Sequence, residues 1–135
     1  MDREELKALL PHREPMLLLD EAELIDGEAI ASYTVRGDEF FLRGHFPGQP
    51  VVPGVILCEM MGQSACVLLA IRGAIPYLTS LDKVRFKNRV LPGDKIALKS
   101  RLLKSKPPFF FIQAEGFVEG KLCVCGELSF ALKQI

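Results

Sequence analysis

The chain has no excess of charge of either sign. Its 135 residues include 17 lysines and arginines and 17 aspartates and glutamates, so the formal net charge at pH 7 is zero. A molecule without net charge exerts little long-range attraction on nucleic acid or on an anionic membrane, although local patches can still attract a partner. The composition therefore gives no reason to expect a nucleic-acid-binding protein.

The chain also lacks a segment that would carry it to or through a membrane. Residues 1–6 are mostly charged and have none of the apolar core of a signal peptide. An apolar stretch at residues 54–71 approaches the length of a transmembrane helix. Glu59 and Gln63 interrupt this stretch, and a carboxylate at the centre of a bilayer is costly. We expect a cytoplasmic protein without a membrane span.

Paired cysteines and metal-binding clusters are missing as well. None of the four cysteines belongs to a C-x-x-C pair, and no cluster of cysteine and histidine has the spacing of a zinc site. A free cysteine most often behaves as a small buried apolar residue. We therefore expect no metal site, no bound cofactor, and reduced thiols at Cys58, Cys66, Cys123 and Cys125.

The order of elements can be predicted along the chain, which has the length of one domain and contains no repeat or linker. Helices are expected at residues 2–10, which Pro11 ends, and at residues 54–71. Arg72-Gly73 is typical of a helix C-terminus, so the long helix should end there. Residues 36–53, rich in glycine and proline, should form a loop. Strands are predicted at residues 21–25, 28–35, 81–91, 95–104, 109–118 and 122–132.

The turns between these strands indicate an antiparallel sheet. Asp26-Gly27 and Glu119-Gly120 are typical of β-hairpins. One long helix combined with antiparallel strands is an α+β arrangement. Because the 54–71 helix is apolar on too many sides to lie on a surface, we expect a curved antiparallel sheet wrapped around it.

Glu59 is the residue that packing explains least well. An ionised carboxylate moved out of water without a partner costs several kcal/mol, unless it takes up a proton. His45 lies upstream in the glycine- and proline-rich loop, and a histidine and a carboxylate at a half-buried site indicate acid/base chemistry. The structural alternatives are a loop histidine bound to a backbone carbonyl and a buried glutamate paired with an arginine.

Several motifs together are specific enough to indicate a family; they are Leu10-Pro11-His12-Arg13, the run from Gly44 to Val55 (GHFPGQPVVPGV), Glu59, Gln63, Arg85-Phe86 and Pro92-Gly93-Asp94. The resemblance that they carry is to the hotdog-fold dehydratases of fatty-acid synthesis, in particular the FabZ type, and it covers nearly the whole chain. It implies a long helix wrapped by a bent antiparallel sheet. It also implies active sites shared between the two subunits of a homodimer. Dimers of this family often assemble further into hexamers, and the sequence does not distinguish a dimer from a hexamer.

The resemblance also implies a reaction and a role for each site residue. The substrate would be a (3R)-hydroxyacyl chain on the phosphopantetheine of acyl carrier protein, and the product a trans-2-enoyl thioester. His45 would take the proton from C2, because its neutral imidazole is available near neutral pH. Glu59 would protonate the departing hydroxyl or orient it, because apolar neighbours favour a protonated carboxyl. The Gly54 N–H, at the positive end of the helix, would polarise the thioester oxygen.

Two further residues are expected to contact the substrate. Val55 follows Gly54 in the motif, and Gln63 lies one turn after Glu59 on the same helix face. Gln63 could bind a water, fix Glu59 in place or face the dimer partner. His12-Arg13 belongs to the motif but has no role that the sequence assigns.

A set of four cations could attract acyl carrier protein, which is acidic and carries a phosphate. Alternation along the predicted 81–91 strand would place them on one face; they are Lys83, Arg85, Lys87 and Arg89. A solvated strand face explains the same pattern equally well.

Three other functions remain as alternatives. A hotdog thioesterase would also carry a carboxylate on the helix but lacks the His-Phe-Pro-Gly motif. A FabA-like dehydratase/isomerase carries aspartate at the position of Glu59. A non-catalytic acyl-binding module would have no use for both His45 and Glu59.

Overall fold

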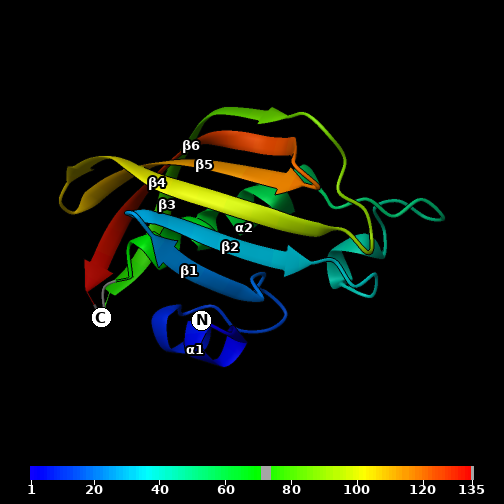
Figure 1. The fold of residues 1–135 in the computed structure, drawn as a ribbon, viewed down its shortest axis with the longest axis horizontal. Helices are drawn as coiled ribbons and strands as arrows, with labels where there is room; N and C mark the ends of the chain where they lie inside the picture. The colour runs from blue at the N-terminus through cyan, green and yellow to red at the C-terminus, as the bar shows by residue number, and fades with distance from the viewer. Residues whose placement is uncertain (71–73, 135) are drawn as a thin grey trace.

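The computed structural model describes residues 1–70 and 74–134 of the chain (Figure 1). Its helices are α1 (Arg3–Leu9), the short 3-10 helix η1 (Phe40–Leu42) and α2 (Gly54–Leu68). Its strands are β1 (Glu21–Ile25), β2 (Glu28–Thr34), β3 (Ala74–Phe86), β4 (Lys95–Lys106), β5 (Phe109–Val118) and β6 (Lys121–Gln134).

The six strands form one antiparallel sheet that curves over α2 (Figure 1). The strand order is β1-β2-β4-β5-β6-β3, so β1 and β3 are the two edges. α2 packs mainly against β2, β4 and β5. This arrangement confirms the predicted α+β hotdog fold with a central helix.

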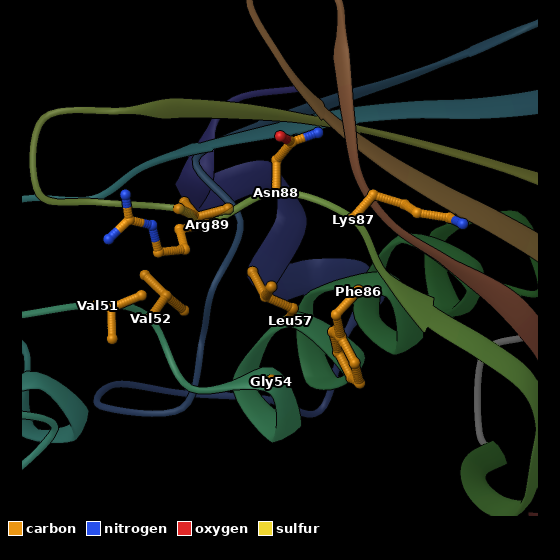
Figure 2. A pocket seen from close by; sticks show the side chains of 9 residues that line it. Val51, Val52, Gly54, Leu57, Phe86, Lys87, Asn88 and Arg89 are labelled. Atoms are coloured by element: carbon orange, nitrogen blue, oxygen red, sulfur yellow. The ribbon is translucent and has the colours of Figure 1, made fainter.

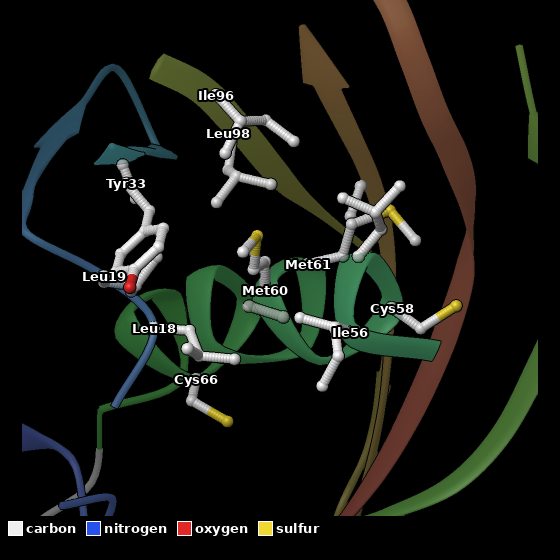
Figure 3. Close-up of a cluster of buried hydrophobic side chains, with 14 of the residues drawn as sticks. Leu18, Leu19, Tyr33, Ile56, Cys58, Met60, Met61, Cys66, Ile96 and Leu98 are labelled. Carbon is white, nitrogen blue, oxygen red and sulfur yellow. The ribbon is translucent and has the colours of Figure 1, made fainter. Parts of the chain in front are cut away.

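α2 is the centre of the hydrophobic core. Eleven of its fifteen residues are buried. Met60 and Met61 have no exposed surface, and Ile96 and Leu98 of β4 face this part of the helix (Figure 3). Complete burial of an apolar side chain of this size contributes about 1.5–3 kcal/mol, so the apolar sequence of α2 anchors it beneath the sheet. No helix in residues 1–70 and 74–134 is long and apolar enough to cross a membrane.

α2 ends three residues before the predicted position. Its last residue is Leu68 rather than residue 71. The N–H of Leu69 donates to Ala65 O at 3.0 Å, and that of Ala70 donates to Val67 O at 3.4 Å. The second bond spans only three residues, as in the tighter turn that often closes an α-helix. The predicted Arg72-Gly73 cap lies outside the described residues.

The predicted 81–91 strand is displaced in the structure. β3 begins at Ala74 and ends at Phe86, and it pairs with β6 from Ala74–Gln134 to Phe86–Val124. The early start was missed because residues 74–80 show no polar–apolar alternation. The chain leaves the sheet after Phe86, where the N–H of Lys87 donates to Cys123 O at 2.7 Å.

The prediction that four cations share one strand face is wrong. The pairing of β3 with β6 shifts register between Asp82 and Arg85, and Lys83 adopts a positive φ of 53°. Such a bulge interrupts the alternation of side chains. Lys87 and Arg89 lie beyond the end of β3, so the strand does not place them on a face with Lys83.

The other strands agree with the sequence pattern to within two residues at most ends. β1 and β5 have the predicted bounds, β2 is one residue shorter, and β4 and β6 extend further by up to two residues. Both hairpin predictions are confirmed. Asp26-Gly27 and Glu119-Gly120 occupy positive φ, as their turns require.

Candidate active site

His45 is held by the loop between η1 and α2. Its Nδ1 lies 2.9 Å from the carbonyl oxygen of Val51, and the Val51 N–H donates to the His45 carbonyl at 2.9 Å. A carbonyl oxygen can only accept, so Nδ1 must carry the hydrogen. In the neutral ring the other nitrogen, Nε2, is then a free proton acceptor. The carbonyl bond expected of an ordinary loop histidine is therefore present, and it leaves the ring able to act as a base.

Glu59 lies in the middle of α2, and its side chain is 34% exposed in the single chain. Its Oε2 accepts a hydrogen bond of 2.8 Å from Gln63 Nε2. The same oxygen lies 3.5 Å from Nε2 of His12. The ion pairs in residues 1–70 and 74–134 include none between Glu59 and an arginine, so the arginine partner considered from the sequence is not found.

Gln63 is fully buried and its amide is fully engaged within the chain. Its Oε1 accepts from the Leu18 N–H at 2.8 Å, while Nε2 donates to Met16 O at 2.6 Å and to Glu59 at 2.8 Å. Both amide hydrogens are therefore used. Of the roles considered from the sequence, this geometry matches the one in which Gln63 fixes Glu59, and it leaves no amide hydrogen for a substrate.

Gly54 begins α2 and lines a cavity of about 350 Å³ (Figure 2). A Cβ at this position would lie 3.0 Å from Cε1 of Phe86, which stands beside the helix start. The first N–H groups of a helix have no partner within it, so they are available to a ligand. The cavity is lined by Val51, Val52, Gly54, Leu57, Phe86, Lys87, Asn88, Arg89 and Val90.

A second cavity, of about 260 Å³, lies between α2 and β3. Glu59, Val55 and His12 line it together with apolar and small side chains. Val55 is 76% exposed. His45 lines neither cavity, and no contact joins it to Glu59 within the described part of the chain. The structure thus brings Glu59, Gln63 and Val55 together. Gly54 lies at the start of α2, and His45 lies in the loop before it.

Burial controls the ionisation of several groups around Glu59. It lowers the pKa of His12, with Arg13 adding to this effect and the charge of Glu59 opposing it. It raises the pKa of Cys66 to about 12 and that of Cys58 above its usual value. Both cysteines line the Glu59 cavity, and both stay protonated at neutral pH. All four cysteines are free, as predicted.

Comparison with known proteins identifies the family. Residues 21–126 match the family model described as ApeI-like, ApeI dehydratase. The chain belongs to the ApeI-like dehydratases. The part of this chain that matches the family model contains His45, Gly54, Glu59 and Gln63 but not His12.

Relatives of this dehydratase match nearly its full length. The chain is 39% identical over 137 residues to the 3-hydroxyacyl-[acyl-carrier-protein] dehydratase FabZ of Clostridium perfringens strain SM101, covering 98% of this chain and 99% of the relative. It is also 39% identical over 139 residues to the FabZ of Streptococcus equi subsp. zooepidemicus strain MGCS10565, covering 99% of each chain. The resemblance to FabZ-type dehydratases stated from the sequence is therefore confirmed.

A solved structure supports the fold. A chain of the dehydratase heterocomplex ApeI:P from Xenorhabdus doucetiae superposes with a TM-score of 0.84. The two chains are 24% identical, and the match covers 96% of this chain and 91% of the other. At this identity the likeness establishes the hotdog fold of the ApeI-like dehydratase.

His12 is the site residue for which no role was predicted from the sequence. Its side chain lies beside Glu59 although 47 residues separate the two in sequence. The sequence signal that could have indicated a site role for His12 was its place in the Leu10-Pro11-His12-Arg13 motif. The contact itself depends on how the segment after α1 folds against α2, which a local pattern does not encode.

Proposed function

We propose that the protein is a hydro-lyase that dehydrates (3R)-3-hydroxyacyl groups carried by acyl carrier protein to trans-2-enoyl thioesters in fatty-acid biosynthesis. The observation that carries the proposal is the bond from His45 Nδ1 to the Val51 carbonyl, which leaves Nε2 as a base. Full-length similarity to two FabZ dehydratases supports the substrate class.

In this proposal His45 and Glu59 share the proton transfers. His45 Nε2 takes the proton from C2, and the electron pair of the C2–H bond forms the C2–C3 double bond as the C3–O bond breaks. Because Glu59 Oε2 accepts from Gln63, the proton given to the departing hydroxyl comes from Oε1, and the hydroxyl leaves as water. In a second form of the step, Glu59 orients the hydroxyl and His45 delivers the proton.

The Gly54 N–H holds the charge that develops on the thioester oxygen. It stands in the first turn of α2, where the helix dipole is positive. The nearby ring of Phe86 leaves room only for a glycine unless the ring shifts. A single donor of this kind contributes about 10²–10³ to the rate in acyl transfer enzymes.

The active site is proposed to form between two protomers, because His45 and Glu59 do not meet in one chain. The free edge of β3 supports this arrangement, since an edge strand offers unpaired N–H and C=O groups to another chain. Exposed apolar side chains lie on β3 and at the start of α2; they are Val55, Tyr77, Leu78, Leu81 and Phe86. A homodimer through this surface would bring the partner's Glu59 to His45, and three such dimers would make a hexamer.

Acyl carrier protein is proposed to approach at the Gly54 cavity. Lys87 and Arg89 line this cavity and provide the positive charge that an acidic carrier and its phosphate would meet. In this proposal Lys87 and Arg89 alone take the role that the sequence analysis assigned to a face of four cations. A cytoplasmic location stays a prediction.

The proposed function is tested with a 3-hydroxyacyl thioester and purified protein. Formation of the enoyl thioester, followed by its absorbance, is the expected result. Release of free thiol would instead identify a thioesterase, and a 3-enoyl product would identify a FabA-like isomerase. Binding without any product would identify an acyl-binding module and overturn the proposal.

A further inference from the structure

The segment after α1 is held rigidly by one arginine. Arg13 Nη1 donates to the carbonyls of Leu10 at 2.9 Å and His12 at 2.7 Å, and Nη2 donates to that of Lys7 at 3.0 Å. Two of these carbonyls, those of Lys7 and Leu10, are at the C-terminal end of α1, where a cation is favourable. The guanidinium therefore fixes the backbone on both sides of Pro11 and sets the direction of the His12 ring.

His12 faces Glu59 with one nitrogen and the protein interior with the other. Nε2 lies 3.5 Å from Glu59 Oε2, and 21% of the His12 side chain is exposed. Nδ1 is buried and has no hydrogen-bond partner within the described residues. A charged imidazole would need an acceptor for both N–H groups, whereas a neutral ring with its hydrogen on Nε2 needs none at Nδ1. The surroundings therefore favour a neutral ring that points its N–H at Glu59.

Glu59 Oε2 thus has two nitrogens of neutral side chains beside it, of which Gln63 Nε2 donates a hydrogen bond and His12 Nε2 lies in contact. The Gln63 bond is 2.8 Å long, and the His12 nitrogen is 3.5 Å from the oxygen. The longer contact is typical of an unliganded acid/base site, in which such bonds tighten when the substrate binds. With Oε2 held in this way, Oε1 is the oxygen left for the substrate hydroxyl.

We infer that His12 is a positioning residue for the dehydration: together with Gln63 it holds Oε2 of Glu59 and directs Oε1 toward the substrate. The inference rests on the proposed function, since it assigns a role toward Glu59 in that reaction. It also accounts for the Leu10-Pro11-His12-Arg13 motif, in which Arg13 fixes the loop and His12 reaches the carboxyl.

The test compares two substitutions at His12. His12→Leu removes the donor, whereas His12→Gln places an amide N–H close to the position of Nε2. Loss of a hydrogen bond to a carboxyl group should lower kcat by about 10-fold to 100-fold in His12→Leu, with KM changed by less than about 3-fold. His12→Gln should recover kcat to within about 5-fold of the unsubstituted protein.

The same pair is then measured in a Glu59→Gln background. A residue that acts through Glu59 should have no further effect on kcat once the carboxyl is gone, so the two losses should not add. Glu14→Gln is the matched control, because Glu14 lies in the same segment but pairs with Arg3 and Lys7 and does not line the Glu59 cavity. It should leave kcat unchanged.

Three results would overturn the inference. They are equal kcat in His12→Leu and the unsubstituted protein, failure of His12→Gln to recover activity, and additive losses in the Glu59→Gln background. Melting temperatures show whether His12→Leu is folded; if it is not, the comparison of His12→Gln with the Glu14→Gln control decides. If the unsubstituted protein makes no enoyl product, the proposed function fails instead, independently of His12.

Discussion

The side chain of Gln63 joins Glu59 to the backbone of a segment more than 40 residues earlier in the chain. Its Nε2 lies 2.8 Å from Glu59 Oε2 and 2.6 Å from Met16 O, and its Oε1 accepts from the Leu18 N–H. The carboxyl is therefore oriented by the core rather than by solvent. This single amide couples the stability of the fold to the geometry of the candidate acid.

Replacement of this amide should damage stability and activity together. Gln63→Leu leaves the Leu18 N–H and the Met16 carbonyl unpaired in the interior, and we expect a loss of about 2–5 kcal/mol in the free energy of unfolding. Ser64→Ala is the matched control on α2, because it removes a single buried hydrogen bond of 2.9 Å to Ser100 and should cost about 1 kcal/mol. Urea unfolding measures both. Similar losses in the two variants would contradict the role given to Gln63.

Two inactive variants should restore activity when they are combined. His45→Asn keeps a donor near Nδ1 for the Val51 carbonyl but has no base at Nε2, and Glu59→Gln has no acid. Each should fold and lose about 10²-fold or more in turnover. If each site takes His45 from one protomer and the partner's Glu59, half of randomly mixed dimers carry one intact site, which gives about a quarter of normal activity.

This complementation is measured after the two variants are unfolded and refolded as a mixture. Separate refolding of each variant is the control, and it should give no recovery. A mixture as inactive as its components would contradict a shared site.

Space at the start of α2 should limit what can replace Gly54. The Cβ of Gly54→Ala would lie 3.0 Å from Cε1 and 3.1 Å from Cζ of Phe86, so the ring or the helix start must move. We expect kcat/KM to fall by about 10-fold to 100-fold, because small displacements of a reacting group are costly. Phe86→Leu removes the crowded ring atoms and should restore part of the activity in the double variant. No recovery in the double variant would show that crowding is not the cause.

The stability of the fold should depend on pH through His12. Burial lowers the pKa of this side chain, so the unfolded chain, with an imidazole pKa near 6.5, binds a proton that the folded chain does not. The free energy of unfolding should therefore be highest above about pH 6.5 and should decline as the pH falls below that value. His12→Gln should show a smaller decline in urea unfolding between about pH 7 and pH 5. An identical decline in both proteins would assign the effect to other groups.

Local sequence was sufficient to predict the hairpins and the central helix. Asp26-Gly27 and Glu119-Gly120 form turns because their residues tolerate positive φ, and this preference acts within a few residues. The apolar run from Gly54 identified the helix that the sheet encloses. The start of β3 and the end of α2 were missed because pairing with β6 and the entry of the chain into β3 depend on distant residues.

The candidate site was predicted as a set of residues but not as an arrangement. His45, Gly54 and Glu59 came from motifs, while the contact between His12 and Glu59 joins a loop to a helix and has no local signature. The expected row of cations failed because the bulge near Lys83 cannot be read from alternating residue types.

The raised pKa values of Cys58 and Cys66 have a consequence for the durability of the protein. Both thiols line the cavity of Glu59, and the product of the proposed reaction is an electrophile that thiolates attack at C3. Because burial keeps both sulfurs protonated, the protein should survive many turnovers without alkylating itself. Intact mass after prolonged turnover should be unchanged, and an alkyl adduct, with the sulfur of either cysteine bonded to C3, would contradict this protection.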